Sequence, residues 1–138
     1  MVSIYEIRGG DCLNYIEEKC KEDTIIRLYN YLVDKYNCKV VFFADSLYND
    51  VDWIVKRLKK NNLPFCVQEI DDIRKSIEYN IDSESQLKIG LRNFSHYTED
   101  SWIRFFIGDS IIQINQLLDE GAELISDSAY ERELISLL

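Results

Sequence analysis

The sequence predicts an α/β (or α+β) fold in a single domain that covers residues 1–138. The 138 residues fit one domain, and a hydrophobic content of 46% is enough for a core. In the first half, apolar runs of strand length alternate with segments of helical periodicity, and strands joined by helical crossovers run parallel. We therefore expect a mixed sheet of about five strands, parallel in its N-terminal part, with a C-terminal hairpin and flanking helices.

The first half of the chain predicts the parallel part of this sheet. An apolar run that ends at Gly9-Gly10 predicts a strand over 2–7, and Asp11 then stands where a helix N-cap belongs. Two further apolar runs predict strands over 39–44 and 65–70. Apolar residues at helical spacing predict helices over 12–21, 25–36, 47–58 and 71–79.

The second half predicts a hairpin followed by helices. Alternation of apolar and polar residues over 87–91 predicts a strand with one wet face, paired with a second strand over 102–107. Ser110 and Gln113 have the spacing of a capping box, which predicts a helix over about 110–125 that Gly121 weakens. A last helix is expected over 130–138.

The charge of the chain restricts its partners. The net charge is −9, which argues against direct nucleic-acid binding because phosphate contacts need a cationic face. This charge is compatible with solubility alone or with docking onto a basic protein. Apart from Arg132, every charged residue of 109–138 is acidic, namely Asp109, Asp119, Glu120, Glu123, Asp127, Glu131 and Glu133. The one basic cluster, at the end of an expected helix, is Lys56, Arg57, Lys59 and Lys60.

Hydropathy and the N-terminus predict a cytoplasmic protein with no membrane partner. No apolar run is long enough to span a bilayer, and residues 1–7 lack the features of a signal peptide. The four cysteines lie in apolar patterns and are expected to be buried thiols, with disulfide, catalytic and metal-binding roles as the alternatives.

Asp45 is the strongest candidate for chemistry. It ends an apolar run, and in parallel α/β sheets ligands bind at the carboxyl ends of strands. Asp50 follows in the expected helix and Asp71 follows the next expected strand, so these carboxylates are candidate ligands of a hard cation such as Mg²⁺. Asp52 diverges from Asp50 on a helix, so only one of the two can join Asp45. The alternative role of these acids is to stabilise a helix N-terminus, and no organic cofactor is indicated.

His96 is the only histidine and a candidate general acid or base, or else an exposed loop residue. The sequence Gly108-Asp109-Ser110-Ile111 resembles the nucleophile motif of the GDSL-type hydrolases, which implies a serine nucleophile. In that family the histidine partner lies near the C-terminus, whereas His96 lies upstream of the motif. A serine nucleophile needs a base within hydrogen-bond reach, so the capping-box interpretation is preferred.

The expected order of elements over residues 2–70 is similar to that of the barstar family, acidic inhibitors of a basic ribonuclease. Ile4-Tyr5-Glu6-Ile7, followed by a glycine turn, resembles the opening of that family. The resemblance implies an inhibitor of a basic protein. The family's Asn-Leu-Asp-Ala-Leu recognition segment has no match in this chain, so no site residues are carried over.

The leading hypothesis is a small acidic protein-binding module of inhibitor or immunity type, acting on a basic protein such as a nuclease toxin or a host-defence protein. The alternatives are a Mg²⁺-dependent phosphoryl-transfer or nuclease-like enzyme centred on Asp45, and a structural subunit or homo-oligomer. Exposed Tyr beside acids is typical of protein-binding patches. The residues expected to contact the partner are Tyr97, Glu99, Asp100, Asp119, Glu120, Glu123, Asp127, Tyr130 and Glu131.

The metal hypothesis predicts that Mg²⁺ or Mn²⁺ binds at millimolar concentrations or below and that Asp45→Asn abolishes binding, because the amide removes the anionic ligand. Isothermal titration calorimetry of both proteins measures this. An unchanged heat signal in the variant would contradict a site at Asp45.

Overall fold

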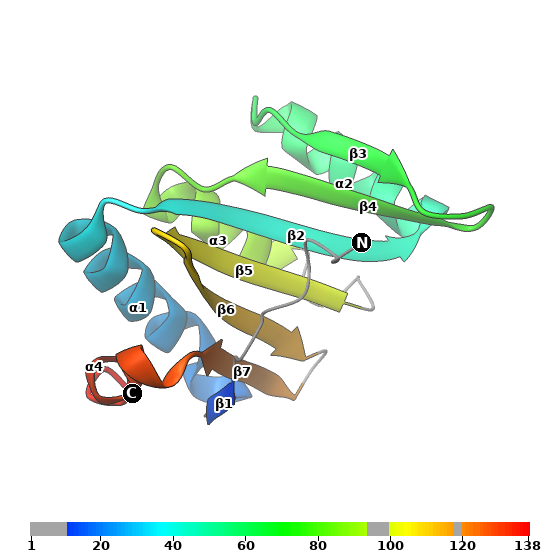
Figure 1. Cartoon of the computed structure of the whole chain (residues 1–138). Coiled ribbons are helices and arrows are strands. Elements are labelled where there is room, and N and C mark those ends of the chain that lie inside the picture. Colours follow the sequence, from blue (N-terminus) through cyan, green and yellow to red (C-terminus); the bar gives the residue numbers. More distant parts are fainter. Residues whose placement is uncertain (1–10, 94–99, 118–119) are drawn as a thin grey trace.

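The computed structural model describes residues 11–93, 100–117 and 120–138. Its strands are β1 (Asp11–Glu17), β2 (Lys39–Leu47), β3 (Cys66–Glu69), β4 (Arg74–Asn80), β5 (Asp100–Ile107), β6 (Ser110–Leu117) and β7 (Gly121–Ser126). Its helices are α1 (Lys21–Tyr36), α2 (Tyr48–Lys60), α3 (Glu84–Asn93) and α4 (Glu131–Ile135), with short 3₁₀ turns η1 (Glu18–Cys20) and η2 (Ser128–Tyr130). The strands form one seven-stranded sheet in the order β1-β7-β6-β5-β2-β4-β3 (Figure 1).

Every pair of neighbouring strands in this sheet is antiparallel, so the predicted parallel part and the predicted number of strands are wrong. The helical crossovers do join strands that point the same way, as β2-α2-β3 and β4-α3-β5. In each case an antiparallel strand lies between the two, β4 in the first and β2 in the second. A strand-helix-strand pattern in the sequence predicts that the two strands point the same way. It does not show whether another strand lies between them in the sheet.

The predicted helix over 110–125 is instead the hairpin of β6 and β7. Gly108, with φ of 57°, makes the turn after β5, and β6 returns beside it. This pairing sets Ile112 opposite Phe105 and Ile114 opposite Ile103, which gives apolar cross-strand pairs on one face. The capping-box spacing was therefore coincidental, and the period of two in these apolar residues was the informative signal.

Three further predictions of element type are wrong. The predicted helix over 12–21 is β1 followed by η1, so the order shared with the barstar family does not hold. The predicted helix over 71–79 is a turn and β4, where Ile77 and Tyr79 alternate into the core. The predicted strand over 87–91 is part of α3, so its hairpin with 102–107 does not form, and β5 pairs with β2 and β6. Short apolar runs are compatible with the periodicity of a helix and with that of a strand, and tertiary contacts decide which of the two forms.

Other predicted elements are confirmed with shifted ends. They are the helices α1, α2 and α4 and the strands β2, β3 and β5. The predicted strand over 2–7 lies outside the described residues. Within the described ranges, no helix has the length and apolar character that a membrane crossing requires.

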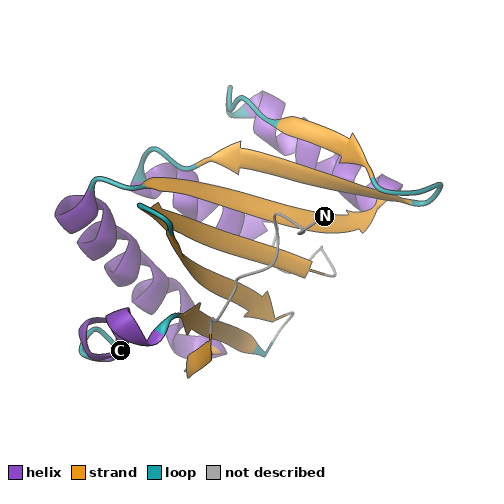
Figure 2. Ribbon diagram, in the orientation of Figure 1, coloured by secondary structure: helices purple, strands orange, loops and turns teal. Residues whose placement is uncertain are grey.

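The hydrophobic core lies between the sheet and the helices, which cover one of its faces (Figure 2). Alternate residues of β2 point to this face, and side chains from all four helices join them. Its fully buried members include Ile25, Leu28, Leu32, Phe42, Ala44, Val51, Ile54, Leu58, Leu87, Ile103, Phe105, Ile112, Ile114, Leu124 and Leu134.

The other face of the sheet also buries side chains near its middle. Arg104 of β5 is fully buried there, and its Nε donates to Gln113 Oε1 of β6 over 2.7 Å. Its guanidinium lies 5.3 Å from the centre of the Phe43 ring of β2. Since Val41 and Phe43 are only 4% and 5% exposed, β2 is buried on both faces.

Substitution of Gly90 by alanine tests the packing of α3 on the sheet. A Cβ there would lie 2.5 Å from Tyr79 Oη and 3.0 Å from the Phe42 ring, whose centroid is 5.1 Å from that of Tyr79. Both rings are buried, so overpacking outweighs the gain in helix propensity of about 1 kcal/mol, and we expect a net loss of roughly 1–2 kcal/mol. Urea unfolding measures it, with Ser85→Ala at an exposed position of α3 as the control. A stabilised Gly90→Ala protein would contradict this close contact.

Candidate functional site

One end of the molecule exposes apolar side chains as a group. There β2 passes into α2, and β3 turns into β4. Leu47, Ile70 and Ile73 are 44%, 50% and 62% exposed. We call the surface formed by these three residues with Tyr48 and Asp71 the hairpin end.

Hydrogen bonds hold the hairpin end in one shape. Asp71 Oδ1 accepts from the backbone N–H groups of Ile73 and Arg74, both at 2.9 Å, which closes the turn between β3 and β4. The backbone N–H of Tyr48 donates to Ile73 O over 3.1 Å, and Tyr48 Oη donates to Asp71 O over 2.9 Å. The start of α2 is therefore tied to the turn, and the exposed isoleucines stand on a fixed frame.

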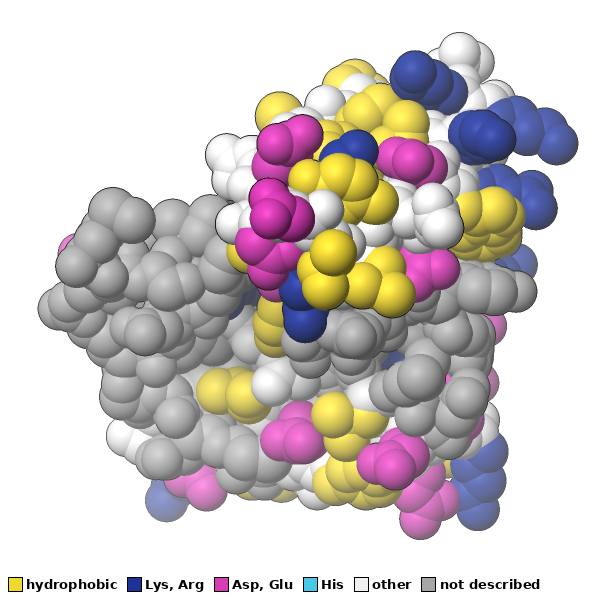
Figure 3. Space-filling view, turned by 90° about the vertical axis from the view of Figure 1, so that its right-hand side faces the viewer, with side chains coloured by type: hydrophobic (Ala, Val, Ile, Leu, Met, Phe, Trp, Pro, Cys, Tyr) yellow, Lys and Arg dark blue, Asp and Glu magenta, His cyan; other side chains and the backbone are white. Residues whose placement is uncertain are grey.

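Carboxylates flank these apolar side chains. Asp52 lies 3.5 Å from Lys75 Nζ, which also sits 4.4 Å from the centre of the Tyr48 ring. Figure 3 looks onto this end of the molecule and shows hydrophobic side chains flanked by acidic ones. We call the carboxylates Asp50, Asp52, Glu69 and Asp72 the acidic rim; with Asp71 they outnumber the nearby cations Arg74 and Lys75 by five to two.

The opposite end of α2 is basic. Lys56, Arg57, Lys59 and Lys60 are exposed in its last turns, and the Arg57 guanidinium lies 5.0 Å from the Trp53 ring. A helix of 13 residues separates its ends by about 18 Å. Acids at the N-terminus and cations at the C-terminus both suit the helix dipole, so α2 carries opposite charge at its two ends.

The acids predicted to bind a metal have other roles or places in the structure. Asp45 lies inside β2, two residues before the strand ends, and not at the start of a helix. The backbone register sets it opposite Ser76 of β4 and Asp100 of β5. Asp50 accepts a hydrogen bond from Ser46 Oγ over 3.0 Å, and Asp71 closes the turn. Among the described residues, no group of three or more His, Cys, Asp or Glu side chains is arranged to hold a metal ion.

The predicted partner-binding acids do not form one helical face, because their segment is a strand. Glu120 lies at the turn before β7, and Asp127 follows its other end, where Asp127 Oδ1 caps η2 by accepting from Ala129 N. The six residues of β7 span about 17 Å, which separates these acids. Glu123 lies within β7, Glu131 is exposed at the start of α4, and Tyr130 packs edge-on against Tyr36 with ring centroids 6.1 Å apart. His96, Tyr97, Glu99 and Asp119 lie outside the described residues, and of Asp100 only the backbone position is described.

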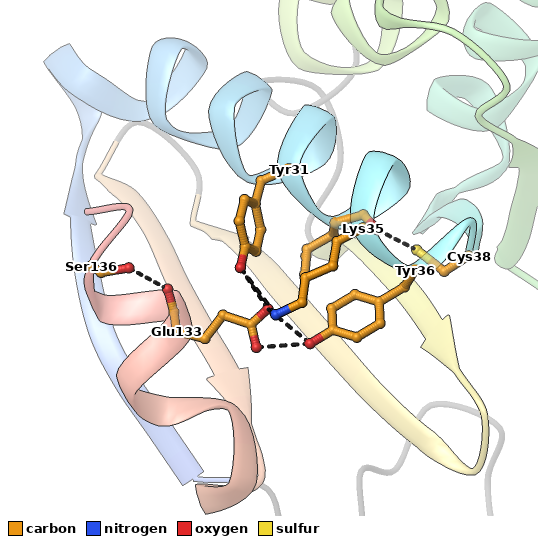
Figure 4. A network of polar contacts seen from close by, with 7 residues as sticks. Tyr31, Lys35, Tyr36, Cys38, Glu133 and Ser136 are labelled. Atoms are coloured by element: carbon orange, nitrogen blue, oxygen red, sulfur yellow. Dashed lines mark hydrogen bonds and ion pairs between the residues drawn. The ribbon is translucent and has the colours of Figure 1, made fainter.

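A polar cluster joins α4 to α1 (Figure 4). Glu133 of α4 accepts hydrogen bonds from Tyr31 Oη at 2.8 Å and from Tyr36 Oη at 2.7 Å and 2.8 Å. Lys35 Nζ donates to the same carboxylate over 2.7 Å. Glu133 is thus surrounded by donors from one face of α1, and this cluster fastens the C-terminal segment to the rest of the fold.

The electrostatics of the cluster favour the ionised carboxylate. Burial alone would raise the pKa of Glu133, but the hydrogen bonds from Lys35, Tyr36 and Tyr31 together lower it below its usual value. The pKa of Lys35 is raised, chiefly by its hydrogen bond to Glu133. Since Tyr31, Lys35 and Tyr36 all donate to Glu133, we assign the cluster a structural role.

A polar cavity of about 370 Å³ lies between the start of α1 and the end of α3. Its wall contains an ion pair of 2.6 Å between Arg92 Nε and Glu22 Oε1, and a second of 3.7 Å between Lys21 Nζ and Glu18 Oε2. Positive and negative side chains are equal in number in its lining, so the cavity favours neither anionic nor cationic ligands.

The three cysteines whose side chains the structure describes are less buried than predicted. Cys20 and Cys66 are exposed and Cys38 is half-buried, and all three are free thiols. Burial raises the pKa of Cys38, which makes its thiol less reactive at neutral pH.

Comparison with models of protein families, with curated proteins and with solved structures finds no match. We therefore infer the role of the hairpin end from its geometry alone. Sequence reasoning missed Leu47, Ile70 and Ile73 because each adjoins an apolar run that reads as buried strand or helix. The available signal was the Asp71-Asp72 pair between two runs of β-forming residues, which is typical of a hairpin turn.

Glu133→Gln should destabilise the protein by about 1–2 kcal/mol at pH 7, because it removes a charged acceptor shared by three donors. The folded-state pKa of Glu133 is lowered, so this stabilisation is complete above the unfolded-state pKa of about 4.3 and is lost as the pH falls through the folded-state value. The difference in urea midpoint between wild type and variant should therefore shrink below about pH 4. A difference that stays constant down to pH 2 would contradict the role of the charge, and Glu131→Gln, exposed on the same helix, is the control.

Proposed function

We propose that the chain is a protein-binding module of inhibitor or immunity type, which docks a basic protein through its hairpin end. The observation that carries the proposal is the group of exposed side chains Leu47, Ile70 and Ile73, which the carboxylates of the acidic rim flank. Isolated exposed apolar residues need no explanation, but a contiguous group with a polar border is typical of an interaction site.

The hairpin end has the composition of a protein interface. Such interfaces have an apolar centre that loses its water and a polar rim that stays hydrated. Among the large apolar side chains that the structure describes, Ile73 is the most exposed at 62%, and it lies beside the Asp71 turn. Because only the exposed part of Ile73 remains to be buried, complete coverage by a partner contributes roughly 1–2 kcal/mol to binding.

The fixed backbone supports tight docking. Tyr48 and Asp71 hold the turn through hydrogen bonds of 2.9–3.1 Å, so little conformational entropy is lost on binding. Recognition by a preformed turn differs from binding by a disordered acidic tail, which must order when it binds.

The charge of the surface favours a basic partner. The acidic rim lies on a chain of net charge −9, so the local and the long-range fields attract the same partner. Complementary charge of this kind mainly raises the association rate and suppresses wrong partners. Acids on β7 and α4, away from the hairpin end, contribute to this field at a distance.

Ile70→Asp combined with Ile73→Asp should abolish capture of the partner, because the charges remove the apolar centre of the surface. The tagged chain and the variant are used as baits in host extract, at 50 mM and 300 mM salt. We expect a basic protein on the wild-type bait that is depleted at least tenfold on the variant and weakened by salt.

Ile135→Asp is the matched control, since Ile135 is 43% exposed on α4, away from the hairpin end. It should retain the partner, and circular dichroism should show that both variants are folded. Loss of capture by the control but not by the hairpin variant, or capture of acidic proteins only, would overturn the proposal.

A further inference from the structure

The two edges of the sheet differ in how they are protected. β1 carries a register irregularity between Cys12 and Asn14, and α4 lies against it. β3 is the last strand of the other edge, so one of its sides pairs with no strand among the described residues. All four of its residues, Cys66–Glu69, are exposed. An open edge of this kind offers unpaired backbone N–H and C=O groups to an added strand.

The charges along the β3 edge reverse from one end to the other. The chain enters the strand from the basic end of α2, where Lys59 and Lys60 precede the turn at 61–62. It leaves the strand through Glu69 and reaches Asp72 at the hairpin end. The middle of the strand, Cys66-Val67-Gln68, carries no charge, and Val67 is 37% exposed.

We propose that β3 pairs antiparallel with β3 of a second copy of this chain, across a two-fold axis, and so joins two sheets edge to edge. In this arrangement the acidic end of each copy meets the basic end of the other, so each contact is made twice. A parallel arrangement would bring like charges together at both ends. A uniformly basic peptide would fit the acidic end but would be repelled by Lys59 and Lys60.

The antiparallel arrangement also suits the layers of the fold. A two-fold axis perpendicular to the sheet keeps the helices of both copies on the same side. Val67 is opposite the buried Ile77 of β4 and points to the helix side. The two Val67 side chains then lie near each other across the new pair of strands, where each is shielded from water.

The strand limits the strength of this dimer. Four residues offer few new hydrogen bonds, and Pro64 has no N–H with which to extend the pairing. The contact is therefore small, and the dimer should dissociate on dilution and with added salt.

Analytical ultracentrifugation of the purified chain under reducing conditions tests the proposal. We expect a monomer–dimer equilibrium that salt weakens. Two variants, Lys59→Glu with Lys60→Glu and Glu69→Lys with Asp72→Lys, each give an edge with the same charge at both ends. Each should weaken self-association by about tenfold or more.

A mixture of the two variants gives the decisive result. An edge with two acidic ends matches an edge with two basic ends, so the mixture should form a heterodimer at concentrations where each variant alone is monomeric. Lys19→Glu with Lys39→Glu changes the net charge by the same amount as Lys59→Glu with Lys60→Glu, at exposed sites away from β3, and should leave self-association unchanged. A wild-type chain that is monomeric at every concentration, a dimer that neither variant weakens, or a mixture that stays monomeric would each overturn the proposal. The measurement needs no basic partner, so its outcome is independent of the proposed function.

Discussion

The pairing of β2 on both of its sides is the constraint on which the rest of the structure depends. Residues Val40 to Ala44 are buried on both faces of the sheet, and β2 is hydrogen-bonded to β4 on one side and to β5 on the other. Because its side chains alternate between two buried faces, a shift of one residue would place Phe42 and Phe43 on the wrong sides. The β2–β4 register in turn positions the β3–β4 hairpin, and the end of β2 positions the start of α2.

Acidic and basic side chains lie at opposite ends of α2 and of the β3 edge. The chain runs through α2 from an acidic start to a basic end, and then through β3 from a basic start to an acidic end. Net charge alone suggests a uniformly acidic surface, whereas the folded chain presents a negative end beside a positive one. The exposed isoleucines lie at the negative end, which supports a basic partner for that surface. The β3 edge joins the two ends, which supports a second copy as the partner of the edge.

Much of the candidate site lay beyond the reach of sequence reasoning. The sequence predicts Asp50 and Asp71 as possible metal ligands, whereas in the fold Asp50 accepts a hydrogen bond from Ser46 and Asp71 closes a tight turn. The helix predicted by the sequence brings the C-terminal acids together, whereas a strand with about 3.3 Å per residue spreads the same residues apart. The hypothesis of an acidic protein-binding module survives as a proposal, with its contact surface moved to the hairpin end.

The sequence by itself determined the local elements with strong periodicity, namely α1, α2 and β2, and the acidic character of the chain. Their apolar spacing is set by residues close together in the chain, so it can be read without the fold. Only the tertiary structure decided the antiparallel order of the sheet, the strands β1, β4, β6 and β7, and the helix α3 with its small residue Gly90 against Tyr79. These segments have short or ambiguous patterns, and partners distant in sequence supply the hydrogen bonds and the buried contacts that select one conformation.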